Sequence, residues 1–115
     1  MITYDDFIKV EIRIGQILSV EVVEGTDKLL KLAVDVGDGV DEEGEPLLRQ
    51  ILSGIRTYFE DPQVLVGKKY PFVTNLEPRV IRGLESHGMI LATSHDDTLA
   101  LLEPTEDIPV GTKVK

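Results

Sequence analysis

The chain has 115 residues, which is the length of one domain and enough to bury a hydrophobic core without crosslinks. It contains no cysteine, so disulfides, thiolate metal sites and cysteine nucleophiles are excluded. The formal net charge of −9 argues, over the whole chain, against a nucleic-acid partner, because Lys and Arg drive binding to phosphates. No apolar run is long enough to span a membrane and the N-terminus lacks the pattern of a secretory signal, so we expect a cytoplasmic protein.

The first part of the chain predicts a short helix followed by a long strand. Thr3 is followed three residues later by Asp6, a spacing that indicates a one-turn helix with a capping interaction. Apolar residues then alternate with polar ones over residues 10–23, with a phase shift near residues 15–19. This pattern predicts one long strand that bends in the middle, at a glycine or a bulge.

The middle of the chain predicts two further strands and a second short helix. Strands are expected over residues 30–36 and 47–53, separated by a polar, glycine-containing hairpin loop over residues 37–46. Asp61 directly precedes a proline, an arrangement that favours the start of a helix, so we expect a short helix around residues 63–65.

The remaining signals are those of short strands. A fourth strand is expected over residues 69–74, where Pro71 indicates an edge strand or a bulge. Residues 75–85 contain proline and glycine and are expected to form a loop. Strands over residues 89–93 and 99–102 follow, with a turn between them.

These elements predict an all-β protein. A long bent strand, a three-strand meander, a short helix between strands 3 and 4 and a further strand match the OB fold, a five-stranded Greek-key barrel, here with a C-terminal β extension. A β-sandwich is the alternative. We expect one OB-fold domain over residues 1–115.

The charges are unevenly distributed along the chain. Acidic blocks lie at residues 35–45 and 96–107, whereas residues 46–95 carry six Lys or Arg against four Asp or Glu. If the acidic loops lie at the opposite end of the barrel, the cations can form a basic face. The alternative is that these are ordinary solvated charges.

The sequence contains no motif for catalysis or metal binding. His87 lies beside Ser86, but neighbours on a strand point to opposite faces, and no nucleophile motif is present. His87 and His95 are the only nitrogen ligands for a metal, and the acidic loop lacks the EF-hand spacing. We therefore expect no enzyme, no cofactor and no metal. Binding remains, and the best local candidate is the stretch 75–89, which combines two Arg, an Asn, a Ser and a Met.

An ordered set of segments resembles the structure-specific tRNA-binding proteins related to the C-terminal domain of bacterial methionyl-tRNA synthetase. The segments are residues 7–15, 24–32, 49–54, 65–69, 75–79 and, most specifically, 85–92, which reads Glu-Ser-His-Gly-Met-Ile-Leu-Ala. The resemblance covers nearly the whole chain, and the length is similar to that of the stand-alone members. It implies an OB fold that binds tRNA by shape, works as a homodimer and serves as an accessory to an aminoacyl-tRNA synthetase.

Positions that match the family's motifs imply a set of RNA contacts. Cations would meet phosphates, a hydroxyl would bind a 2′-hydroxyl or phosphate, and a methionine would pack against a sugar or base. The resemblance implies these roles for Lys28, Arg49, Asn75, Arg79, Ser86 and Met89. The charge pattern adds Arg82.

The chain also departs from the family. Glu77 and Val80 occupy positions where relatives often carry Lys, and the acidic loop is longer and more negative than expected. Export-related chaperones share the fold family, so a peptide-binding chaperone is the alternative function, with a small hydrolase as a third hypothesis. The motif over residues 82–89 favours RNA.

The C-terminal tail predicts an interface. It carries more apolar residues than a finished barrel requires: Leu99, Leu101, Leu102, Ile108, Val110 and Val114. An exposed patch of this kind is typical of interfaces, and two-fold pairing is the commonest way to cover one. We therefore predict that residues 95–115 form a dimerisation extension. The alternative is that the tail folds back over its own barrel.

Overall fold

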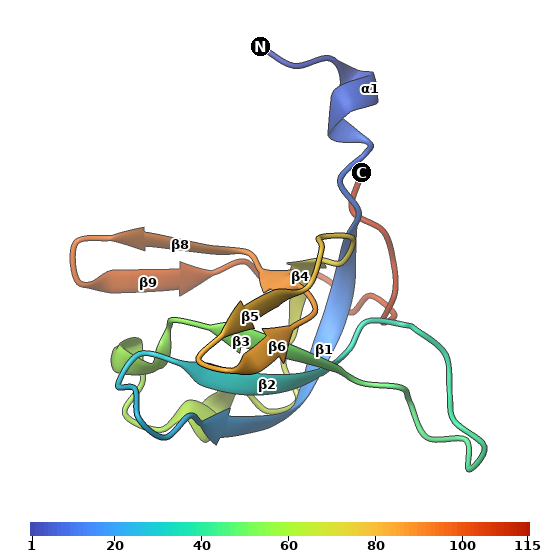
Figure 1. The fold of residues 1–115 in the computed structure, drawn as a ribbon. Coiled ribbons are helices and arrows are strands. Elements are labelled where there is room, and N and C mark those ends of the chain that lie inside the picture. Colours follow the sequence, from blue (N-terminus) through green and yellow to red (C-terminus); the bar gives the residue numbers. More distant parts are fainter.

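Five antiparallel strands form the central sheet, in the order β3-β2-β1-β4-β7 (Figure 1). The computed structural model describes residues 1–115. The sheet strands are β1 (Ile12–Val22), β2 (Leu30–Asp35), β3 (Arg49–Ser53), β4 (Lys69–Val73) and β7 (Met89–Ile90). The other elements are α1 (Tyr4–Phe7), the 3₁₀ helices η1 (Arg56–Tyr58) and η2 (Pro62–Leu65), and the strands β5 (Arg79–Ile81), β6 (Leu84–Ser86), β8 (Ala92–His95) and β9 (Thr98–Leu101).

The sheet curls into a nearly closed barrel, which confirms the predicted all-β, OB-type fold. β3 lies at one edge of the sheet and β7 at the other, and the chain just before β7 bridges them. The amide of His87 donates to the carbonyl of Gln50 at 2.9 Å, and the amide of Leu52 donates to Oγ of Ser86 at 2.9 Å. Closure in this way satisfies backbone groups that an open edge would leave exposed.

Strand β1 organises the barrel because it pairs with both of its neighbours. Its first half pairs with β4 and its second half with β2. The register with β2 shifts between Ile17 and Ser19, and this bulge lets the strand turn from one half of the barrel to the other. The bend predicted from the phase shift is therefore confirmed.

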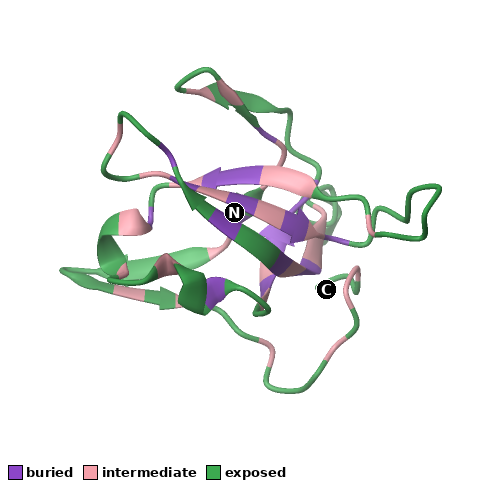
Figure 2. Ribbon diagram, turned by 90° about the horizontal axis from the view of Figure 1, so that it is seen from below, coloured by how far each residue is buried: buried purple, intermediate pink, exposed green.

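The core fills the inside of this barrel, where alternate residues of each strand point inwards. β2 shows the pattern most clearly, since Leu30, Leu32 and Val34 are fully buried and the residues between them are not. Phe72, Ile17 and Ile51 are among the largest fully buried side chains. Figure 2 shows buried residues gathered on the barrel strands, while the loops and the outer hairpins are exposed.

Both predicted helices are present at the expected positions. Thr3 accepts a hydrogen bond from the amide of Asp6 at 3.1 Å, and the Asp6 carboxylate accepts from the amide of Thr3, so the capping interaction is confirmed. The second helix is the 3₁₀ helix η2. The side chain of Asp61 caps it by accepting from the amide of Gln63 at 3.1 Å.

Residues 75–85 contain a β-hairpin where the sequence predicted a loop. β5 and β6 pair from Arg79↔Ser86 to Ile81↔Leu84, around the two-residue turn Arg82-Gly83. Both turn residues have positive φ, 53° and 79°, as a type I′ turn requires. The turn escaped prediction because arginine is not among the residues that favour the left-handed region.

Pro71 lies in an interior strand, so the predicted edge or bulge is wrong. In the register of β1 with β4, Pro71 lies opposite Ile14. The amide and the carbonyl of Ile14 both bond to the C-terminal segment, so the two residues form a pair without hydrogen bonds between them. The backbone of Pro71 therefore faces away from β1. On the β7 side only the Pro71 carbonyl is used, accepting from the amide of Leu91 at 3.2 Å. A residue without an amide hydrogen therefore fits there.

The C-terminal segment has two parts. The β8–β9 hairpin projects from the barrel, but Leu99 and Leu101 pack against the core cluster (Figure 1). Further on, the carbonyl of Thr112 accepts from Ile14 at 2.9 Å and the carbonyl of Ile12 accepts from Val114 at 2.8 Å, so the chain end lies along β1. None of the helices in the structure is long and apolar enough to cross a membrane.

We predict that Gly15→Ala destabilises the barrel by about 1–3 kcal/mol, the usual cost of overpacking a core. A Cβ at this position would lie 2.8 Å from the Phe72 ring and 2.9 Å from the side chains of Val34 and Val36. Urea unfolding with an unchanged m value measures the effect. Gly54→Ala is the control, because a Cβ there meets nothing within 4 Å. Equal stability of the two variants would contradict the prediction.

Candidate nucleic-acid interface

Two connections lie beside the outer surface of β2 and β3, the positions from which OB folds contact nucleic acids. The first joins β1 to β2 over residues 23–29. The second is the β5–β6 hairpin, which lies in front of β2 and β3 in Figure 1. Each connection presents cations.

Three of the predicted contact residues are exposed cations whose side chains have no partner. Lys28 lies in the β1–β2 connection, Arg79 in β5 and Arg82 in the hairpin turn. None of their charged groups takes part in an ion pair or a hydrogen bond. Each can therefore bind a phosphate without first breaking a contact with the protein.

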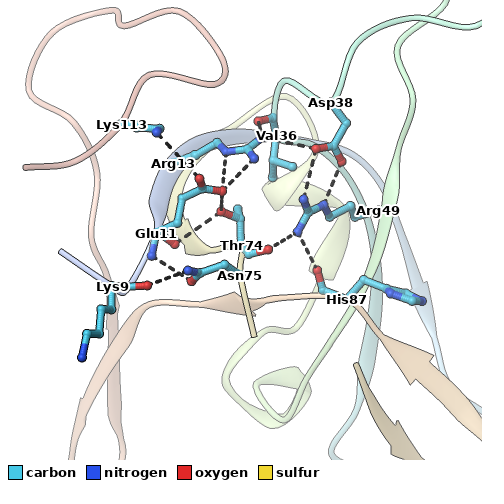
Figure 3. Close-up of polar contacts among 10 residues, drawn as sticks. All are labelled: Lys9, Glu11, Arg13, Val36, Asp38, Arg49, Thr74, Asn75, His87 and Lys113. Atoms are coloured by element: carbon cyan, nitrogen blue, oxygen red, sulfur yellow. Dashed lines mark hydrogen bonds and ion pairs between the residues drawn. The ribbon is translucent and has the colours of Figure 1, made fainter. Parts of the chain in front are cut away.

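Arg49, a fourth predicted contact, has its guanidinium committed inside the protein (Figure 3). Nε and Nη2 donate to the two carboxylate oxygens of Asp38 at 2.8 and 3.1 Å. Nη1 donates to the backbone carbonyls of Thr74 and His87. A phosphate would have to displace Asp38 to reach this group.

The predicted segregation of charge is therefore wrong at Arg49. The acidic loop does not lie away from the cations, because its first carboxylate, Asp38, binds both Arg49 and Arg13. The two guanidiniums hold the pKa of Asp38 below its ordinary value, first through the hydrogen bond from Arg49. Burial of the carboxylate acts in the opposite direction.

A second carboxylate extends this network towards the N-terminal segment (Figure 3). Glu11 accepts from the hydroxyl of Thr74 at 2.6 Å and from Nη2 of Arg13 at 2.7 Å, and Lys113 lies 3.8 Å away. The hydrogen bond from Thr74, followed by that from Arg13, lowers the pKa of Glu11. The network thus joins both chain ends to the barrel.

Asn75, predicted to contact RNA, also has its side chain bound within the protein. Oδ1 accepts from the amide of Glu11 at 2.8 Å, and Nδ2 donates to the carbonyl of Lys9 at 2.6 Å. The amide group therefore holds the chain between α1 and β1 against the end of β4. Its visible role is to position that segment.

Ser86 is buried, with 5% of its surface exposed. Its hydroxyl accepts from the amide of Leu52 and donates to the carbonyl of Gly88 at 3.1 Å, so it helps to close the barrel. Met89 is exposed and lines a small hollow together with Arg79 and Leu76. Of these two predicted contacts, only Met89 presents its side chain to solvent.

The sequence did not single out several residues of this region. The sequence places Asp38 in the acidic block over residues 35–45. It places the others in predicted strands: Arg13, Leu48, Gln50 and Thr74. The contacts that these residues make are distant in sequence, since Asp38 and Arg49 are 11 residues apart and Glu11 and Thr74 are 63 apart. No local pattern reports such a contact.

A small antiparallel barrel of the OB type with unpaired cations on its connections is typical of nucleic-acid-binding domains. The family model described as "Putative tRNA binding domain" matches residues 12–113. The chain belongs to this tRNA-binding domain family.

Relatives and solved structures give the same picture. The chain is 45% identical over 116 residues to the methionine–tRNA ligase of Deinococcus radiodurans, covering 100% of this chain and 16% of that protein. It is 46% identical over 114 residues to the enzyme of Streptococcus pneumoniae serotype 4, with 98% and 16% covered. The chain thus spans about one-sixth of the curated relatives it matches, and those full-length relatives are enzymes.

Two solved structures align along the whole chain. The MetRS related protein from Pyrococcus horikoshii superposes with a TM-score of 0.85 at 34% identity, covering 100% of this chain and 98% of that one. The CsaA chaperone protein from Picrophilus torridus superposes with a TM-score of 0.82 at 28% identity, covering 100% of both chains.

We predict that acid destabilises the protein partly through Asp38 and Glu11. Their folded pKa values are lowered, so their contribution is present above the unfolded pKa of about 4 and is lost as the pH falls through the folded values. Asp38→Asn should flatten the fall in unfolding free energy between about pH 5 and pH 2, and should cost about 1–3 kcal/mol at pH 7. Glu42→Gln, an exposed carboxylate with no ion-pair partner, is the control. The same pH profile for Asp38→Asn and the wild type would contradict the prediction.

Proposed function

We propose that the chain binds tRNA, without catalysis, through the connections that flank β2 and β3. The observation that carries this proposal is the set of unpaired cations at Lys28, Arg79 and Arg82, in a chain that belongs to a tRNA-binding domain family. Cations of this kind bind phosphates irrespective of sequence, so recognition depends on how the folded RNA places its phosphates. We include Met89 as an apolar contact beside the hairpin.

Arg49, Asn75 and Ser86 have supporting roles in this proposal. Their polar groups are occupied within the protein, so they shape the surface from which the free cations project. Arg49 can still add positive potential, but Asp38 cancels much of it at close range.

Removing one free cation should weaken tRNA binding by a defined amount. Titration of bulk tRNA at several salt concentrations should give a log–log slope of roughly −3 to −5, as expected for four to six phosphate contacts. Arg79→Gln should lower the affinity for all tRNAs and reduce the magnitude of this slope by about 1 for each copy of the chain that contacts the RNA. Lys68→Gln is the control, because Lys68 is an exposed cation without an ion-pair partner and lies beside residues 103–107. No binding at low salt, or a slope that does not respond to salt, would overturn the proposed function.

We also propose that the chain forms a homodimer. The support is an apolar hollow of about 400 Å³ between α1 and the chain end, to which Phe7, Ile8, Val10 and Val114 contribute. These side chains are 39–54% exposed in one copy, and a second copy would cover them. Two copies would also double the number of free cations facing one RNA.

Light scattering should give a mass of about twice the 12.8 kDa of one chain. Ile8→Asp should shift this mass towards one chain, because a charge in an apolar interface costs desolvation energy. Val64→Asp is the matched control, since Val64 on η2 is 56% exposed and Ile8 is 54% exposed. A mass of one chain for the wild type at micromolar concentration would refute the dimer.

A role beside an aminoacyl-tRNA synthetase is a further part of the proposal. Its support is that the curated relatives carry the matching segment within methionine–tRNA ligases. The expected consequence is faster charging of tRNA at low concentration when the chain is added to such an enzyme. An unchanged rate would remove this role.

The alternative function is that of a peptide-binding chaperone. The likeness to the CsaA chaperone protein supports it, as do the exposed apolar side chains of Leu47, Leu48 and Val80 near the same surface. This alternative would be favoured if the chain suppressed the aggregation of a denatured client protein, if Arg79→Gln did so equally well, and if the chain did not bind tRNA.

A further inference from the structure

A hollow of about 610 Å³ lies on the outer surface of the barrel beside β3. It is lined by Leu48, Arg49, Gln50, Leu76 and His87. A second hollow, of about 280 Å³, shares the first three of these residues, so the two lie next to each other at β3. The hollow beneath the β5–β6 hairpin measures about 40 Å³, which is room for about one water molecule. Of these three hollows, the first offers the most room for a planar ring system.

The charge in this hollow is already neutralised. Arg49 is its only permanent cation, and the carboxylate of Asp38 and two backbone carbonyls occupy that guanidinium. Four of the five N–H groups of Arg49 are taken by these acceptors, so a phosphate placed here would find one remaining N–H of Nη2 and would be repelled by Asp38. The hollow therefore favours an uncharged group.

The remaining lining combines apolar surface with one fixed polar atom. Leu48 and Leu76 are each 46% exposed. Gln50 donates through Nε2 to the carbonyl of Glu85 at 2.9 Å, which fixes the amide and leaves Oε1 as an acceptor without a protein partner. Nε2 of His87 lies 3.0 Å from a carboxylate oxygen of Glu85.

We propose that this hollow binds a single unpaired base of the RNA. This inference rests on the proposed function and deepens it. Leu48 and Leu76 supply the surface against which the base packs, and Oε1 of Gln50 accepts a hydrogen bond from its exocyclic amino group. The phosphates on either side of the base are then bound by Arg79 and Arg82, which are free. Bases of this kind are available only where the RNA is unpaired.

The test compares a fully paired RNA duplex with the same duplex carrying one bulged adenosine. We expect the wild-type protein to bind the bulged duplex about five- to tenfold more tightly, the size of effect that packing of one base produces. Leu48→Ala should bring this ratio close to one. Leu47→Ala should preserve it, because Leu47 is equally exposed, at 45%, but does not line the hollow. Arg79→Gln should weaken binding of both duplexes, because each of them offers phosphates.

A bulged uridine tests the hydrogen bond, because uracil has no exocyclic amino group. It should bind less tightly than the bulged adenosine, and Gln50→Leu should remove the difference. Equal binding of the two bulges by the wild type would overturn the role of Gln50.

Binding of bulk tRNA in the same assay separates the two proposals. If tRNA binds but the two duplexes bind equally, or neither binds, the base site is overturned and the proposed function stands. If tRNA does not bind, both are overturned. A further outcome is that a denatured polypeptide binds the wild type but not Leu48→Ala, while the wild type binds the bulged and the paired duplex equally. This outcome would assign the hollow to peptides and would overturn the base site.

Discussion

The guanidinium of Arg49 is the point at which the separate parts of this barrel are held together. It projects from β3, takes both oxygens of Asp38 at the start of the acidic loop, and reaches the carbonyls of Thr74 and His87 at either end of the segment that carries the β5–β6 hairpin. A planar donor with several N–H groups in fixed directions can satisfy these acceptors at once. Arg49 thus adds to the bonds by which Gln50, Leu52 and Ser86 hold the hairpin segment on β3.

This arrangement separates two kinds of cation on a chain whose net charge is −9. Arg13, Arg49 and Lys69 are bound to carboxylates and determine the shape of the protein. Lys28, Arg79 and Arg82 have no such partner and are available to another molecule. The formal charge of the chain says little about its capacity for phosphates, because what matters is which cations remain unpaired at the surface.

Local features of the sequence were sufficient to predict much of the fold. The Thr3 and Asp6 capping pair, the bend in β1 and the helix after Asp61 each depend on neighbouring residues, and each is present. The β5–β6 turn was missed because arginine adopts a positive φ there. The resemblance implied RNA contacts for Arg49, Asn75 and Ser86, but it could not show that their polar groups are occupied within the protein. Their partners lie between 11 and 66 residues away, apart from one bond within the β6–β7 connection. Such contacts form only when the barrel closes.

Both ends of the chain leave the barrel at one corner, because the segment after Gly111 runs along β1 and the N-terminal helix enters the same strand (Figure 1). Anything covalently joined to either end would start from that corner, where Ile8 and Val114 line one hollow. Fusion to a larger polypeptide and the proposed association with a second copy would then require the same surface. If the chain pairs as proposed, a larger polypeptide joined at this corner would cover surface that the second copy needs.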